Sequence, residues 1–158
     1  MSEPPIPTEE IYGSWRLVSW RQTILGTGEI VAADDDNPDS GYITYGRDGR
    51  FLGLIVRGAR PRVESVSAIT DTLATELFRT MVAYGATFEF DGRTIVHHID
   101  ISWNEAWTGT TQTRDVSRDG DRLVYRTRPA PDAQDGRPSI VTLVWERVRT
   151  IEPFPQTS

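Results

Sequence analysis

The sequence predicts a mainly β fold, an eight-stranded antiparallel up-and-down β-barrel with one α-helix after the third strand. Short runs rich in Val, Ile, Thr, Tyr, Phe and Trp alternate between apolar and polar residues, as half-buried strands do. Asp-Gly pairs, which favour tight hairpin turns, separate several of these runs. Closing such a meander into a barrel removes its exposed edges. A two-sheet sandwich remains the alternative.

The elements are expected in the following order. Residues 1–10 contain three prolines and predict an extended lead-in. The barrel domain is expected over residues 11–148, and a C-terminal tail over residues 149–158. The eight predicted strands span residues 12–24, 41–46, 50–57, 85–90, 93–102, 109–118, 121–128 and 138–148. Loops are expected at residues 26–40, 58–69 and 129–137.

Residues 70–84 break the alternation and predict the single helix. Apolar residues recur there at intervals of three or four, which places them on one helix face. They are Leu73, Leu77, Met81 and Tyr84. Thr70 or Asp71 can cap the helix, because a side-chain oxygen there accepts a bond from a free backbone N–H.

Composition narrows the range of partners. The chain has 158 residues, of which 37% are hydrophobic, so it can bury one core. The 17 basic and 23 acidic residues give a net charge of -6, which disfavours nucleic acid and anionic membranes as partners. No run of apolar residues is long enough for a membrane span, and residues 1–10 lack the pattern of a secretory signal. We therefore expect a cytoplasmic protein of bacterial type, as a monomer or homodimer.

Several chemistries are excluded by residue type. All 17 basic residues are Arg, so no lysine is present to form a Schiff base. The chain has no cysteine for a disulfide, a thiolate nucleophile or a metal site. His97 and His98 are neighbours on a predicted strand and point to opposite faces, so they cannot share one ion. No phosphate loop, dinucleotide fingerprint or serine-hydrolase elbow is present. We expect no metal and no cofactor.

The hairpin at Asp91-Gly92 predicts which histidine faces the barrel interior. A two-residue loop at these positions pairs Ala86 with His97. In this register His97 lies on the apolar, inner face of its strand. His98 then lies on the more polar, outer face.

The hairpin at Asp119-Gly120 extends this inner face. A two-residue loop there pairs Arg114 with Tyr125 and points both inward. If Gly109 lies opposite Ser102 in the preceding connection, His97 also comes close to Arg114. The predicted polar interior cluster consists of His97, Gln112, Arg114, Tyr125 and Thr127. At the Asp48-Gly49 turn the two faces of residues 41–57 are about equally apolar, which leaves the inner face undecided.

A resemblance to a known family rests on several short motifs. Residues 12–20 read YGSWRLVSW, which resembles the Gly-x-Trp start of lipocalins and, more closely, of the bacterial and fungal lipocalin-like domain family. Further motifs follow in matching order: GYITY at 41–45, YGATF at 84–88, VHH at 96–98, WTGT at 107–110 and WER at 145–147. The resemblance covers roughly residues 11–148. It implies a lipocalin- or calycin-like barrel with one closed end, where Arg147 stacks on Trp15.

The same resemblance implies two kinds of function, because related barrels include passive binders and cofactor-free enzymes. In the first interpretation the protein is a cofactor-independent lyase, isomerase or cyclase acting on a small, largely apolar, oxygenated compound. His97 would be the acid or base, while Arg114 and Tyr125 hold a carbonyl, enolate or carboxylate oxygen. The alternative is a passive carrier of a small apolar or aromatic molecule. The candidate ligand-binding residues are Tyr45, Tyr84, Phe88, Trp107, Gln112 and Thr127.

A purely structural interpretation of the polar cluster is also open. In that case His97 is a core histidine whose ring nitrogens are satisfied by neighbours. Arg114 is then paired with a buried carboxylate, with Glu89, Glu105 and Asp115 as the candidates.

Overall fold

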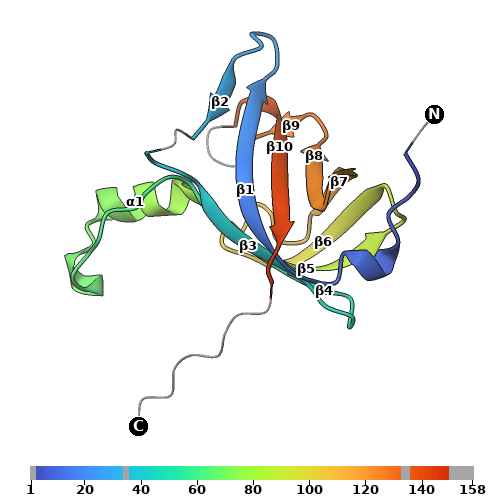
Figure 1. Ribbon diagram of the computed structural model, residues 1–158. Helices are drawn as coiled ribbons and strands as arrows, with labels where there is room; N and C mark the ends of the chain where they lie inside the picture. The colour runs from blue at the N-terminus through green and yellow to red at the C-terminus, as the bar shows by residue number, and fades with distance from the viewer. Residues whose placement is uncertain (1–2, 34–35, 133–135, 150–158) are drawn as a thin grey trace.

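The computed structural model describes residues 3–33, 36–132 and 136–149, and its strands wrap into a closed barrel (Figure 1). The barrel wall contains β1 (Gly13–Ile24), β3 (Ser40–Tyr45), β4 (Arg50–Val56), β5 (Met81–Phe90), β6 (Thr94–Ser102), β7 (Thr111–Asp119), β8 (Arg122–Thr127) and β10 (Pro138–Arg147). Each strand pairs antiparallel with the next one in this order, and β10 returns to pair with β1. The predicted eight-stranded barrel is confirmed, and the sandwich alternative is wrong.

Two very short strands extend this wall. β2 (Ile30–Ala32) pairs with the end of β1, and β9 (Ala130–Pro131) pairs with the start of β10. Both lie in segments predicted as loops, since three or two residues are too few for a recognisable alternation. Because β2 precedes the helix, the helix follows the fourth strand, and its predicted place after the third strand is wrong.

The helix α1 (Asp71–Arg79) is shorter than the predicted 70–84. Thr70 caps it as expected, with its hydroxyl accepting from the Leu73 backbone N–H at 3.2 Å. From Met81 onward the chain belongs to β5, which pairs with the whole length of β4. Backbone pairing along β4 therefore outweighs the helical spacing of the apolar side chains.

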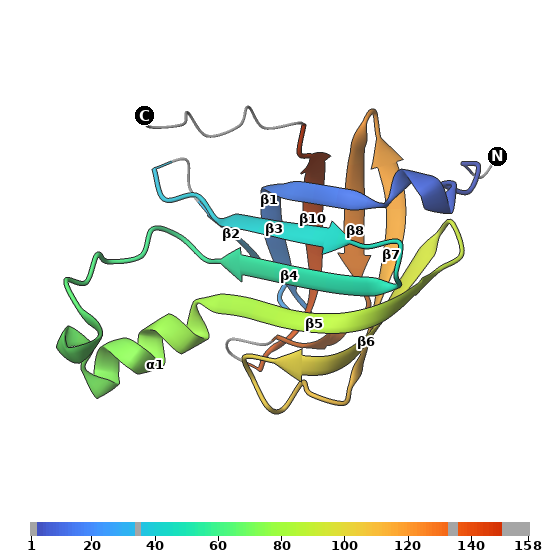
Figure 2. The same cartoon turned by 90° about the horizontal axis from the view of Figure 1, so that it is seen from below.

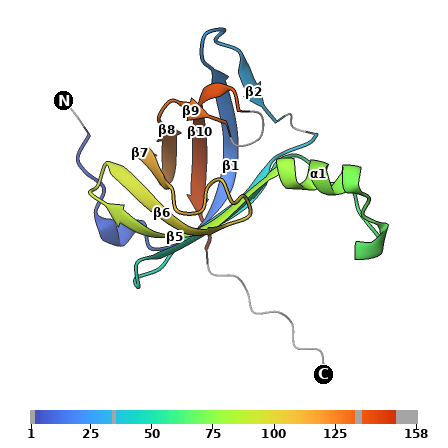
Figure 3. The same cartoon turned by 180° about the vertical axis from the view of Figure 1, so that it is seen from behind.

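Figures 2 and 3 show α1 leading away from the barrel wall. None of its residues is fully buried. Its C-terminal end is held by two bonds to backbone carbonyls, from Trp103 to Phe78 at 3.1 Å and from Arg60 to Leu77 at 2.7 Å. Within the described ranges, no helix has the length and apolar character needed to cross a membrane. Short 3-10 turns occur at Thr8–Glu10 and Val66–Ala68.

The β5–β6 hairpin differs from the predicted register. His97 pairs with Phe88 and not with Ala86. The reason is that Gly92 has a φ of 96° and takes the first loop position, so the loop is Gly92-Arg93. A shift of two residues leaves every side chain on its original face. The inward position of His97 is therefore confirmed.

The β7–β8 hairpin differs in the same way. Arg114 pairs with Thr127 and not with Tyr125, because Gly120, with a φ of 64°, starts a Gly120-Asp121 loop. Arg114 and Tyr125 are both buried, as the shared face requires. The predicted registers were wrong by two residues at both hairpins, while the predicted inner faces are confirmed.

The β6–β7 pair adds one correction, and the β3–β4 pair decides a face that the sequence left open. His97 pairs with Gln112, so the predicted alignment of Ser102 with Gly109 is wrong, because the connection between these strands folds into two successive turns. The β3–β4 loop contains three residues, which pairs Tyr45 with Phe51 and places both on one face. Phe51 consequently points inward, beside Tyr45.

One end of the barrel is closed by the N-terminal segment. Ile6, which lies in the predicted extended lead-in, and Ile11, at the start of the predicted barrel domain, are both buried in the core. The Ile6 backbone N–H donates to the Gly92 carbonyl at 2.8 Å, and the Trp15 indole donates to the Ile11 carbonyl at 2.9 Å. The guanidinium of Arg147 lies 4.2 Å from the Trp15 ring centre, so the contact implied by the resemblance is confirmed. Most of the predicted tail, residues 150–158, lies outside the described residues.

Candidate functional site

Two cavities lie at the other end and in the middle of the barrel. The outer cavity has a volume of about 280 Å³. Its walls include Trp20, Trp107, Gln112, Thr127 and Val141. The inner cavity measures about 50 Å³ and is bordered by Phe51, Tyr84, His97, Tyr125 and Trp145, among others. The two cavities adjoin, because they share the lining residues Ile55, Val82, Arg114 and Leu143.

His97 on β6 lies at the base of the inner cavity and is only 1% exposed. The Tyr45 hydroxyl lies 2.8 Å from its Nε2 atom, and the Tyr84 hydroxyl lies 2.7 Å from its Nδ1 atom. The Phe51 ring stacks on the imidazole with 4.1 Å between ring centres. His98 is exposed and contacts Glu89 at 3.0 Å, as its predicted outward position requires. The ring nitrogens of His97 are thus both satisfied by tyrosine hydroxyls.

A third tyrosine fixes the direction of these hydrogen bonds. Tyr125 donates its hydroxyl proton to the Tyr45 oxygen at 2.9 Å. A phenol has one proton, so Tyr45 donates its own to Nε2 of His97. The imidazole proton then lies on Nδ1 and is donated to Tyr84. Among the described residues none accepts the Tyr84 proton, and Tyr84 lines the inner cavity. This hydroxyl can therefore donate to a molecule bound there.

Burial keeps this chain of side chains neutral. It lowers the pKa of His97 well below its usual value, and the positive charge of Arg114 adds to this effect. Burial likewise raises the pKa of Tyr45, Tyr84 and Tyr125. At neutral pH the interior therefore combines an uncharged imidazole and three uncharged phenols with one fixed cation, the guanidinium of Arg114.

Arg114 on β7 points into the barrel and is 8% exposed. Its Nη1 atom donates to the Gln112 side-chain oxygen at 3.3 Å and to the Thr113 carbonyl at 3.2 Å. Its Nε and Nη2 atoms have no hydrogen-bond partner among the residues that the structure describes. Arg114 also borders both cavities. The unused N–H groups are thus available to a molecule at the junction.

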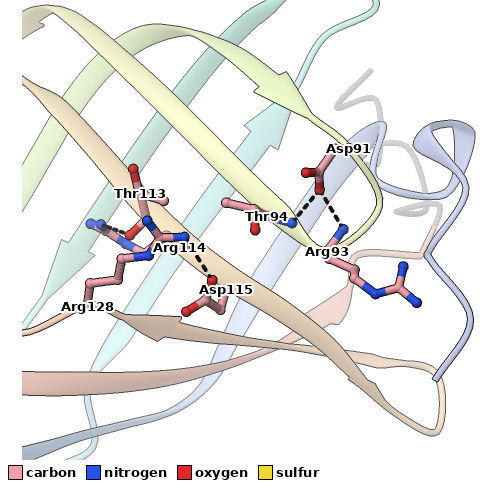
Figure 4. Close-up of polar contacts among 7 residues, drawn as sticks. All are labelled: Asp91, Arg93, Thr94, Thr113, Arg114, Asp115 and Arg128. Atoms are coloured by element: carbon pink, nitrogen blue, oxygen red, sulfur yellow. Dashed lines mark hydrogen bonds and ion pairs between the residues drawn. The ribbon is translucent and has the colours of Figure 1, made fainter. Parts of the chain in front are cut away.

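The carboxylates considered as partners of Arg114 are bound elsewhere. Asp115 contacts Arg128 at 3.4 Å on the exposed side of the sheet, as Figure 4 shows together with the bond from Arg114 to Thr113. Glu89 contacts His98, and Glu105 accepts from Thr108 at 3.3 Å. Both ring nitrogens of His97 have hydrogen-bond partners, as the structural interpretation expects. This interpretation is wrong for these three partners of Arg114.

The remaining candidate residues divide between the cavities and the packed core. Trp107, Gln112 and Thr127 line the outer cavity. Tyr45 and Phe88 line neither cavity and pack edge to face below them, with 4.8 Å between ring centres.

Many of the lining residues were not identified from the sequence, and four of them show why. Phe51 was missed because the two faces of residues 41–57 are about equally apolar, and only the three-residue β3–β4 loop places it beside Tyr45. Trp20 lines the outer cavity at the far end of β1, under the Arg57 guanidinium, which lies 3.2 Å from a ring centre. Val82 falls in the segment predicted as helix. Leu143 alternates with Trp145 on the last strand, and this spacing could have identified it as inward-facing.

The barrel and its interior site lie within a region that matches a known protein family. A family model described as a lipocalin-like domain matches residues 12–148. The chain belongs to the lipocalin-like domain family. The predicted resemblance is confirmed over nearly the range expected, and the lipocalin-like barrel suggests that a small molecule binds inside it. A comparison with curated proteins finds no match.

Proposed function

We propose that this lipocalin-like protein binds a small, largely apolar molecule in its barrel and acts as a carrier or sensor. The observation that carries the proposal is the outer cavity of about 280 Å³, which adjoins an inner apolar cavity. An apolar cavity of roughly 150 Å³ is enough to bind benzene. The outer cavity can therefore hold a ring system with a short substituent. Apolar walls with a few polar groups are typical of small-molecule sites.

Catalysis is the second candidate, and the chain of hydrogen bonds through His97 favours it. This candidate is a cofactor-independent lyase, isomerase or cyclase. Direct proton transfer by His97 is hindered, because tyrosine hydroxyls occupy both ring nitrogens. A substrate in the inner cavity instead meets the Tyr84 hydroxyl, which can act as an acid while the Nδ1–H of His97 donates to the phenolate left on Tyr84. The carrier is preferred because binding requires only the cavities, whereas catalysis also requires proton transfer by groups whose pKa values burial shifts away from neutrality.

A fluorescence titration tests binding. The probe is N-phenyl-1-naphthylamine, which is neutral, apolar and brighter outside water. We expect the wild-type protein to raise its emission in a saturable manner. Val82→Trp fills the wall shared by both cavities and should abolish the increase. Val66→Trp adds the same ring at a position that is 87% exposed and should leave it unchanged.

Two results of the titration would contradict the proposal. Circular dichroism first establishes that both variants are folded. Absence of saturable binding to the wild-type protein, or equal binding to folded Val82→Trp, contradicts a site inside the barrel. If Val82→Trp does not fold, Val82→Phe is the smaller replacement.

Native mass spectrometry of the purified protein distinguishes the two candidates. A bound compound released on denaturation is identified and then incubated with fresh protein. An unchanged compound supports the carrier. Conversion that is lost in Tyr84→Phe supports the enzyme, and conversion that persists in this variant contradicts the acid role of Tyr84.

A further inference from the structure

Arg114 is a buried cation without a charged partner in the part of the chain that the structure describes. Removing a guanidinium from water is costly unless an opposite charge or several good hydrogen bonds replace the water. Arg114 has two long bonds from one nitrogen, at 3.2 and 3.3 Å. Arg57, another largely buried arginine, instead contacts the Asp39 carboxylate at 3.0 Å and covers Trp20. No carboxylate of the described residues therefore forms an ion pair with Arg114, and the carboxylate that lines the same outer cavity is Asp132.

The unused part of Arg114 has a definite shape. The Nη1 protons are donated to Gln112 and Thr113. The remaining edge carries the N–H groups of Nε and Nη2, which lie side by side in one plane. This edge matches the two oxygens of a carboxylate, which it binds with two parallel hydrogen bonds.

The surroundings favour a single negative charge. Arg128 is the other cation that lines the outer cavity, and its guanidinium is directed to Asp115 on the exposed side. Apolar side chains at the junction, Ile55, Val82 and Leu143, suit a hydrocarbon body next to the charged group. The Tyr84 hydroxyl in the inner cavity supplies one more donor. One free arginine edge fits a carboxylate better than a doubly charged phosphate.

We propose that the ligand is a small apolar monocarboxylic acid whose carboxylate binds side-on to Nε and Nη2 of Arg114. This inference rests on the proposed function and names the class of molecule that the barrel holds. It assigns Arg114 as the residue that selects an acid over a neutral compound of the same shape.

The test compares 1-naphthylacetate with 1-naphthylacetamide, which have similar shapes and differ in charge. Each compound is titrated against the protein loaded with N-phenyl-1-naphthylamine at one fixed pH and salt concentration. We expect the acid to displace the probe at a concentration about tenfold or more below that of the amide, as a charged hydrogen-bonded pair permits. Arg114→Met should reduce this preference to about one while the probe still binds.

Two further variants make the test specific. Arg128→Met removes the neighbouring arginine of the outer cavity and should keep the acid preference. Arg114→Gln replaces Arg114→Met if that variant does not fold. An acid preference that survives at Arg114→Met, or that disappears at Arg128→Met, overturns the assignment.

The proposal and the function on which it rests fail in different ways. If the probe binds the wild-type protein but the acid displaces it no better than the amide, the acid class is wrong and barrel binding stands. If the probe does not bind, both are wrong.

Discussion

Tyr125 donates its hydroxyl proton to Tyr45 at 2.9 Å, although the two residues lie on β8 and β3, which are not neighbouring strands. The bond crosses the barrel interior and determines the role of every polar atom beyond it. Tyr45 must donate to His97, and His97 must donate to Tyr84. Removing one of these hydroxyls therefore breaks a different set of hydrogen bonds in each case.

Replacing the tyrosines by phenylalanine should give a ranked loss of stability. Tyr45→Phe removes two bonds and leaves the Tyr125 hydroxyl and the Nε2 atom of His97 without a partner, so it should be the most destabilising. Tyr84→Phe leaves the buried Nδ1–H of His97 without an acceptor and should cost about 1–3 kcal/mol. Tyr125→Phe leaves no donor unsatisfied and should cost about 1 kcal/mol or less. Urea unfolding measures the order. Equal losses for Tyr84→Phe and Tyr125→Phe would contradict the direction of the chain.

The buried His97 should make stability depend on pH. In the folded protein its pKa is well below the usual value of about 6.5, so the unfolded chain takes up the proton first on acidification. The stability that the neutral His97 contributes is fully present above about pH 6.5 and is lost as the pH falls towards the folded pKa. The free energy of unfolding then falls by up to about 1.4 kcal/mol per pH unit.

The measurement is the free energy of unfolding between pH 5 and 7.5. His97→Gln should remove this part of the slope. His98→Gln changes the exposed neighbour and should retain it. The groups facing His97 are Tyr45, Tyr84 and Arg114. A wild-type slope that is unchanged in His97→Gln would refute the neutral, buried imidazole.

Arg114→Met should stabilise the protein in the absence of a ligand. The substitution replaces an uncompensated buried cation with an apolar side chain of similar length, and such exchanges gain up to about 1–4 kcal/mol. Arg128→Met breaks only an exposed pair and should change stability by less than about 0.5 kcal/mol. Chemical denaturation measures the free energy of unfolding of both variants and of the wild-type protein. If Arg114→Met is the less stable variant, the bonds to Gln112 and Thr113 already compensate the charge.

Ile6→Ala should loosen the closed end of the barrel. Ile6 is 5% exposed and its N–H donates to Gly92, whose Cα lies so close to Pro5 that a Cβ there would come within 2.6 Å. A core substitution of this kind costs about 2–5 kcal/mol. The loss is limited here to the free energy with which the segment docks on the barrel. Amide exchange at Ile6 should accelerate, whereas Pro4→Ala, at an exposed position, should leave it unchanged.

The sequence predicts which side chains face inward better than it predicts their partners. Strand alternation repeats every two residues, so a register error of two changes each pair but no face. His97 and Arg114 were therefore placed inside correctly from hairpins whose loops begin one residue later than expected. At the β3–β4 loop two equally apolar faces left the choice open, and the loop length places Phe51 inside.

The parts of the candidate site that were missed depend on distant contacts. Met81 and Tyr84 follow a helical spacing, but only the presence of β4 beside them determines that they form a strand. The bonds from Tyr45 and Tyr84 to the two sides of His97 join three strands across the barrel. No local pattern contains this information. The unpaired state of Arg114 likewise follows from the partners that Glu89, Glu105 and Asp115 find elsewhere.

The position of Arg114 between a small inner and a larger outer cavity sets an order of entry for an acid bound there. About 50 Å³ beyond the guanidinium leaves no room for a ring, so the hydrocarbon part must remain on the outer side. The acid would thus enter head first, with its tail towards the opening. Selectivity would be strict for the head group and permissive for the tail. A family of acids with different tails would then share one receptor, and a dye attached to the tail would report occupancy without blocking it.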